Sequence, residues 1–327
     1  MEKYFLHPEK VRRYLADDFE TLDLNAYYDP SDILDRPEPV TLRIPNEMTG
    51  SGIAFLSERG NPSFARTYEW KTGEETVVFY NCYPGRTYNV RFRSGEKTAE
   101  SSFCTDAELP CTLYVDGIRN VRDFGGWTAK NGVLREGLLY RGSEMNLIDN
   151  HGIELTEEGK RTMLKTLAIR TDLDLRNEKE SGFLTESPLG AQVRYFRKPV
   201  LGYMDFFGEQ FNDTVREIFE ILANRENYPI YVHCWAGADR TGTLIALLKA
   251  ALGVSYEDIT RDFELSAFSV FGLRGRCNRD FTYCEVFEHL KSVYSAPSLC
   301  DSAIRYLFEK VGINENTLNA IRSILVG

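Results

Sequence analysis

The chain has 327 residues, of which 43% are hydrophobic, 27% charged and 13% aromatic. This length and apolar content suffice for two globular domains and exclude a disordered, coiled-coil or collagen-like chain. The net charge of −10 argues against a nucleic-acid-binding protein, and the longest apolar runs are too short to form a membrane span.

Residues 1–37 are acidic and loosely patterned, and one short helix is expected at residues 8–15. The first twenty residues alternate charged and apolar side chains and contain no apolar core of a secretory signal. The chain as given therefore predicts a cytoplasmic protein. An exported or periplasmic protein whose signal has been removed from this sequence is the alternative.

Residues 38–108 predict a small antiparallel β-sandwich, because short β-type runs separated by turn residues follow one another along the segment. Residues 81–88 (NCYPGRTY) resemble the strand–turn–strand signature of fibronectin type III domains, in which the tyrosine closes a corner. An ordinary hairpin turn is the alternative interpretation. We expect this domain to position the rest of the protein or to bind a partner that the sequence does not identify.

Residues 109–327 predict an α/β domain. Strand-like runs at 167–175, 192–200 and 229–234 alternate with helical patterns at 157–165, 211–225, 241–252 and 256–265. Two amphipathic helices separated by Gly312 are expected in residues 301–326. This alternation favours a mostly parallel sheet flanked by helices.

The seven cysteines are an odd number and include no C-x-x-C pair, and the four histidines lie far apart in the sequence. The pattern therefore predicts neither a disulfide framework nor a metal site. One cysteine stands out by its context. Cys234 ends an apolar strand-like run, Arg240 follows six positions later, and a helix-forming run begins at once.

The loop between Cys234 and Arg240 is suited to binding an anion. Its backbone N–H groups can converge on one point, backed by the dipole of the following helix. A thiol at the mouth of such a cradle is activated as a thiolate, and a guanidinium can hold two phosphate oxygens. Thr241 can donate its hydroxyl to the sulfur. The residues expected to bind the anion through the loop are Trp235, Ala236, Gly237 and Ala238.

This loop (HCWAGADRT) resembles the H-C-x-x-G-x-x-R-[ST] loop of the cysteine-dependent protein tyrosine phosphatase superfamily. Four more segments resemble motifs of its bacterial tyrosine phosphatase-like branch, namely residues 118–126 (IRNVRDFGG), 139–143 (LYRGS), 174–180 (DLRNEKE) and 262–266 (DFELS). The resemblance covers residues 115–327. It implies the fold of those phosphatases and hydrolysis of phosphomonoesters through a phosphocysteine, with Cys234 as nucleophile, Arg240 binding phosphate, and neither metal nor cofactor.

The sequence leaves the general acid open. Asp239 lies inside the loop, where some relatives are thought to use an aspartate. Asp205 lies in an aromatic loop, about where dual-specificity relatives carry a mobile acid. Asp174, at the end of a predicted strand, is a third candidate. Asp174 and Arg176 are also candidates for substrate binding, although Arg176 is expected rather to brace carboxylates.

These residues predict a protein-tyrosine phosphatase, or one of dual specificity, that acts on a phosphorylated protein or a small phosphomonoester. Ala238 favours phosphotyrosine, because relatives that prefer phosphoinositides often carry a lysine there. A phosphoinositide or inositol phosphate phosphatase is the first alternative. A phosphate-binding adaptor with weak catalysis is an alternative of another class.

Overall fold

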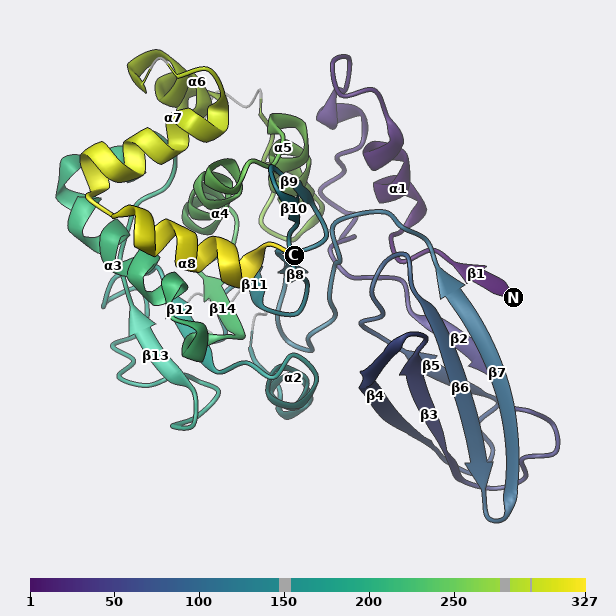
Figure 1. Ribbon diagram of the computed structural model, residues 1–327. Coiled ribbons are helices and arrows are strands. Elements are labelled where there is room, and N and C mark those ends of the chain that lie inside the picture. The colour runs from purple at the N-terminus through teal and green to yellow at the C-terminus, as the bar shows by residue number, and fades with distance from the viewer. Residues whose placement is uncertain (147–153, 277–282, 295) are drawn as a thin grey trace.

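The computed structural model describes residues 1–146, 154–276, 283–294 and 296–327. A β-sandwich lies beside a larger α/β unit (Figure 1). The sandwich has a five-stranded sheet in the order β1-β7-β6-β3-β4 and a two-stranded sheet of β2 and β5. Its strands are β1 (Glu2–Tyr4), β2 (Val40–Arg43), β3 (Gly52–Glu58), β4 (Asn61–Trp70), β5 (Thr76–Phe79), β6 (Thr87–Ser94) and β7 (Lys97–Thr105).

The two sheets of the sandwich share one apolar core. Side chains alternate between the faces of a strand, so Val90 of β6 points inward and packs in one cluster with Leu42 of β2 and Phe79 of β5. The hydroxyl of Tyr88 accepts a hydrogen bond from the backbone N–H of Tyr83 at 2.8 Å. This bond ties the start of β6 to the preceding turn. The likeness to fibronectin type III domains remains a resemblance of this one segment.

The second sheet has the order β13-β12-β14-β11-β8 and is parallel except for β8, which confirms the expected α/β class. Its strands are β8 (Arg122–Asp123), β11 (Leu139–Gly142), β12 (Thr171–Asp174), β13 (Arg194–Arg197) and β14 (Ile230–His233), and a hairpin of β9 (Thr128–Ala129) and β10 (Gly132–Val133) adjoins it. The last residues of β11 and β12, Gly142 and Asp174, both pair with His233 at the end of β14. The carboxyl ends of these strands therefore meet at one edge, where α/β sheets bind ligands.

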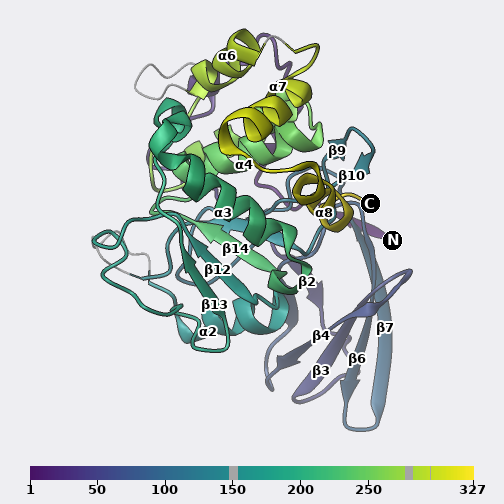
Figure 2. The same cartoon turned by 60° about the vertical axis from the view of Figure 1, so that its left-hand side comes forward.

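Helices cover both faces of this sheet (Figure 2). Ile230 and Val232 of β14 join a core formed with α3, α4, α6, α7 and α8, whereas Tyr231 points into a second core with Met163 of the segment after α2. The helices are α2 (Glu157–Arg161), α3 (Asn212–Ala223), α4 (Asp239–Leu252), α5 (Tyr256–Glu264), α6 (Tyr283–Tyr294), α7 (Leu299–Tyr306) and α8 (Glu315–Leu325). Two short 3₁₀ helices, η3 (Tyr203–Phe207) and η6 (Leu265–Phe268), contribute to the site.

Helix α6 was not expected from the sequence, and α4 begins two residues earlier than its pattern predicts. No helix among the described residues is long and apolar enough to cross a membrane.

The N-terminal segment, residues 1–37, contacts both units. Strand β1 adds residues 2–4 to the sandwich sheet by pairing in parallel with β7. Helix α1 (Glu9–Ala16) lies beside α5 and above the sandwich in the view of Figure 1. Its Val11 and Tyr14 pack with Leu265 and Phe268 of η6. The segment is thus packed into the sandwich and the α/β unit alike, which its irregular sequence pattern did not indicate.

Candidate active site

Cys234 lies at the carboxyl end of β14 as a free, buried thiol. The chain then turns through four residues into α4, as the strand–loop–helix pattern predicts. Gly237 within the turn has φ +66°, and a Cβ at this position would lie 2.1 Å from the carbonyl oxygen of Gly142. Only glycine fits here, because the loop packs directly on the end of β11 and its backbone is left-handed.

Three consecutive carbonyl groups of this loop accept hydrogen bonds from residues in or next to two of the motif segments, 118–126 and 139–143. The bonds run from the Glu144 N–H to the carbonyl of Trp235 at 3.0 Å, from the Asn120 side-chain amide to that of Ala236 at 3.0 Å, and from the Arg141 guanidinium to that of Gly237 at 2.7 Å. The donors come from the loop before β8 and from β11 and its end. The orientation of the loop is therefore set by its neighbours in space.

The amide groups that follow these carbonyls must point the other way, because the C=O and N–H of a planar trans peptide are antiparallel. These are the N–H groups of Ala236, Gly237 and Ala238. Among the described residues, no acceptor is recorded for any of the three. Together with the first turn of α4 they form a row of free donors, which is the arrangement of an anion-binding loop.

Arg240 sits in the first turn of α4 and is half-buried. Its Nη1 donates to Oε2 of Glu180 at 2.8 Å. Burial alone would lower the pKa of Arg240, but the neighbouring Cys234, Glu180 and Asp239 outweigh it and raise the pKa. Arg240 is therefore a cation paired with the carboxylate of Glu180.

Asp239 adjoins Arg240 and is held by two donors. Nε of Arg274 lies 2.8 Å from its Oδ1, and the hydroxyl of Tyr203 donates to the same oxygen. Tyr203 begins η3, whose backbone N–H at that residue donates to Oγ1 of Thr243 at 2.8 Å, so η3 is docked on α4. Burial, with Asp239 close by, raises the pKa of Tyr203. Arg274 was not predicted from the sequence, because it lies in a loop without a recognisable motif.

The other acid candidates have different surroundings. Asp205 is exposed on η3, and no hydrogen bond to its side chain is recorded within the described part of the chain. Asp174 is fully buried and accepts from the guanidinium of Arg176 and from the hydroxyl of Tyr195 at 3.0 Å. Burial would raise the pKa of Asp174, but His233 and Arg176 outweigh it and lower the pKa. Asp174 is therefore an ionised structural carboxylate.

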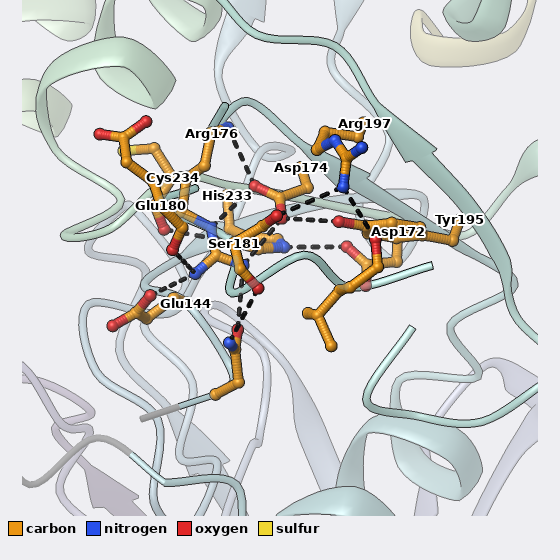
Figure 3. A network of polar contacts seen from close by, with 12 residues as sticks. Glu144, Asp172, Asp174, Arg176, Glu180, Ser181, Tyr195, Arg197, His233 and Cys234 are labelled. Atoms are coloured by element: carbon orange, nitrogen blue, oxygen red, sulfur yellow. Dashed lines mark hydrogen bonds and ion pairs between the residues drawn. The ribbon is translucent and has the colours of Figure 1, made fainter. Parts of the chain in front are cut away.

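Arg176 is the centre of a buried polar network beneath the loop (Figure 3). Its guanidinium donates to both Asp174 and Glu144, and to the amide oxygen of Asn146 at 2.9 Å. Asp172, on the same strand as Asp174, contacts Nε2 of His233 at 2.9 Å. The network fixes the residue before Cys234, and Arg176 braces carboxylates as its motif suggested.

A second buried network supports the loop from the side of α5. Asp262 forms ion pairs of 3.0 Å with each of Arg122, Arg141 and Lys249. Burial would raise the pKa of Asp262, but the three cations outweigh it and hold the pKa well below its usual range. Because Arg141 also holds the Gly237 carbonyl, this cluster links α5 to the anion-binding loop.

Thr241 is fully buried in α4, and its Oγ1 has no hydrogen-bond partner among the described residues. A buried hydroxyl without a hydrogen bond destabilises the fold. The Thr241 hydroxyl is therefore available to donate a hydrogen bond to a group bound at the loop. Within the same described ranges, no group of three or more His, Cys, Asp or Glu side chains could hold a metal ion.

A model of the tyrosine phosphatase family matches residues 113–327. The chain belongs to the tyrosine phosphatase family. The match includes every residue of the candidate active site described above, and it excludes the N-terminal segment and the sandwich.

Two curated relatives illustrate the range of the similarity. A candidate tyrosine-protein phosphatase of Cupriavidus necator is 30% identical over 176 residues, which are 46% of this chain and 61% of the relative. The inositol diphosphatase DSP5 of Arabidopsis thaliana is 25% identical over 155 residues, or 47% of this chain and 71% of the relative. The chain thus spans less than two thirds of the Cupriavidus protein.

Among solved structures, the core catalytic domain of the PP-IP phosphatase SIW14 from S. cerevisiae is 18% identical to this chain. The aligned region covers 50% of this chain and 94% of that domain. Its TM-score of 0.31 is too low to carry an argument about function.

Proposed function

We propose that this member of the tyrosine phosphatase family hydrolyses phosphomonoesters, phosphotyrosine among them, through a phosphocysteine at Cys234. The observation that carries the proposal is the orientation of three consecutive carbonyl groups between Cys234 and Arg240, which point toward neighbouring segments of the protein and hydrogen-bond there. This orientation leaves the N–H groups of Ala236, Gly237 and Ala238 without recorded acceptors among the described residues, close in the chain to the Arg240 guanidinium and the Cys234 thiol. Fixed donors of this kind stabilise the oxygens of a transferring phosphoryl group.

The chemistry then takes two steps. In the first, the Cys234 thiolate attacks phosphorus, the bond from phosphorus to the leaving oxygen breaks, and the Asp239 carboxyl gives its proton to that oxygen. In the second, water attacks the phosphocysteine, the sulfur–phosphorus bond breaks, and Asp239 accepts a proton from the water. The hydroxyl of Thr241 donates a hydrogen bond to the departing sulfur. Asp239 is assigned as the acid because it adjoins Arg240 and is held in place by Arg274 and Tyr203.

The surroundings of the loop support a single aryl phosphate as substrate. Ala238 is fully buried, so this position presents no cation to a second phosphate. Trp235 is half-buried and stacks edge to face with Phe271, with ring centroids 5.2 Å apart. An aromatic pair beside the loop can contact the phenyl ring of phosphotyrosine.

The test is a substrate panel with the intact chain: a phosphotyrosine peptide, a phosphoserine peptide, a phosphoinositide in mixed micelles and an inositol polyphosphate. We expect the highest kcat/KM for the phosphotyrosine peptide, and a phosphorylated Cys234 peptide detected by mass spectrometry after acid quenching. Cys234→Ser should turn over no substrate and still bind vanadate. Turnover by Cys234→Ser would overturn the nucleophile, and preference for the inositol compound would overturn the substrate class.

A further inference from the structure

Asp35 belongs to the N-terminal segment but is buried against the phosphatase unit, with 1% of its side chain exposed. Its three side-chain partners among the described residues all lie in that unit. It accepts the backbone N–H of Asn120 at 2.9 Å, the hydroxyl of Ser269 at 2.6 Å and the guanidinium of Arg119 at 3.2 Å. A carboxylate from outside the family-matched region therefore joins the loop before β8 to the loop after η6.

Asn120 connects Asp35 to the anion-binding loop. Its side-chain amide donates to the carbonyl of Ala236 at 3.0 Å and to Oγ of Ser266 at 3.2 Å. Its φ is +58°, in the left-handed region, which asparagine adopts more readily than other residues with a Cβ but which still costs free energy relative to the right-handed region. The bond from Asp35 to the N–H of this same residue is one of the restraints on this conformation.

We propose that Asp35 is a positioning residue for the phosphate-binding loop. It holds Asn120 in its left-handed conformation, Asn120 holds the Ala236 carbonyl, and the N–H of Gly237 is thereby kept turned toward the phosphate. This inference rests on the proposed function. It makes the N-terminal segment a part of the active-site structure, although the family match begins at residue 113.

A contact that only stabilises the fold would give a different result, and the chain offers a control for it. Tyr14 lies in the same N-terminal segment, is fully buried, and donates to Oε2 of Glu264 on α5 at 2.8 Å. The other recorded partner of the Glu264 side chain among the described residues is Arg276. Tyr14→Phe therefore removes a buried bond between the same segment and the same unit, and among the described residues neither Tyr14 nor the Glu264 side chain hydrogen-bonds to Asp35, Asn120 or the anion-binding loop.

The experiment compares the full chain with Asp35→Ala, Asp35→Asn and Tyr14→Phe, using p-nitrophenyl phosphate turnover, vanadate inhibition and thermal unfolding. Asp35→Ala should lower kcat/KM roughly 10- to 100-fold, mainly through kcat, because it leaves a buried donor without a partner and frees the loop. The vanadate inhibition constant should rise by a similar factor. Asp35→Asn should recover part of the rate, since its amide oxygen can still accept the Asn120 N–H. Tyr14→Phe should lower the melting temperature and keep the wild-type kcat.

A double-mutant cycle tests the route. If Asp35 acts through Asn120, Asp35→Ala combined with Asn120→Ala should slow turnover by much less than the product of the two single effects. Additive effects, or wild-type kcat/KM in Asp35→Ala, would overturn the proposal. If Asp35→Ala is insoluble, the cycle is run with Asp35→Asn. If the wild-type chain has no turnover, the proposed function fails by itself, and calorimetric binding of vanadate to the same variants still decides the role of Asp35.

Discussion

The guanidinium of Arg240 and the carboxylate of Glu180 lie 2.8 Å apart. Glu180 closes the motif at residues 174–180 and is 41% exposed at its side chain, whereas Arg240 is 15% exposed. If Arg240 binds phosphate as proposed, an incoming phosphate and Glu180 compete for the same cation. The competition is weak, because a partly exposed ion pair is stabilised by at most about 1 kcal/mol.

From this pair we predict that Glu180→Gln binds inorganic phosphate and vanadate roughly two- to fivefold more tightly. The amide removes the competing charge and keeps the shape of the side chain. Glu178→Gln is the matched control. Glu178 lies in the same segment as Glu180, but it pairs with Arg197 of β13 at 3.1 Å and not with Arg240. Inhibition constants from competition with p-nitrophenyl phosphate measure the effect. Weaker anion binding by Glu180→Gln, or an equal change in the control, would show that Glu180 does not compete.

The left-handed backbone of Gly237 and its contact with Gly142 predict a severe effect of Gly237→Ala. The new Cβ would collide with the end of β11 and displace the loop, and we expect kcat/KM to fall roughly 100-fold or more. Gly60→Ala separates the two causes, because Gly60 also has a positive φ of +86° but a Cβ there would meet no atom within 4 Å. That control should lose about 1 kcal/mol of stability and no activity. Comparable turnover by both variants would contradict the packing described for the loop.

The dependence of rate on the leaving group distinguishes the acid candidates. Losing a general acid slows substrates with poor leaving groups far more than activated aryl phosphates, which depart unprotonated. We expect Asp239→Asn to slow phosphotyrosine hydrolysis roughly 10²- to 10⁴-fold and to affect dinitrophenyl phosphate much less. Asp205→Asn should leave the ratio of the two rates unchanged. The reverse outcome would assign the acid to Asp205 on η3.

Asp123 gives the stability of the protein a specific dependence on pH. It is buried where it accepts the N–H groups of Gly125 and Gly137, each at 2.7 Å, and burial raises its pKa from 3.8 to about 7 in spite of these donors. Between these values the native state binds the proton more tightly than the unfolded chain does. The contribution of Asp123 to the free energy of unfolding is therefore complete below pH 3.8 and is lost as the pH rises through 7. The free energy of unfolding falls by up to about 4 kcal/mol over this range.

Urea unfolding at pH 4.5 and pH 7 measures that loss. Asp123→Asn cannot ionise, so its free energy of unfolding should fall less between the two pH values than that of the wild type. An identical fall in both proteins would mean that Asp123 ionises in the native state with its ordinary pKa.

Much of the fold follows from local sequence pattern. The short β-type runs expected in residues 38–108 became β2 to β7, and the three strand-like runs of the second unit contain β12, β13 and β14, because strand periodicity is a property of consecutive residues. The loop from Cys234 to Arg240 was found for the same reason: the thiol, the glycine, the guanidinium and the helix start are contiguous in the chain. Strands β8 and β11 were not expected: β8 is only two residues long, and the short apolar stretch of β11 ends in arginine and glycine.

The partners that orient this loop were decided only by the tertiary structure. Asn120, Arg141 and Glu144 reach the three carbonyls from positions about ninety or more residues earlier, and no spacing in the sequence states which acceptor a buried amide or guanidinium will meet. The same holds for Asp35, one of many acidic residues in the N-terminal segment. Its role depends on burial, which removes water as a competing partner and makes each hydrogen bond of the carboxylate obligatory. Sequence pattern thus determined where the candidate site lies in the chain, and packing determined which way its loop faces.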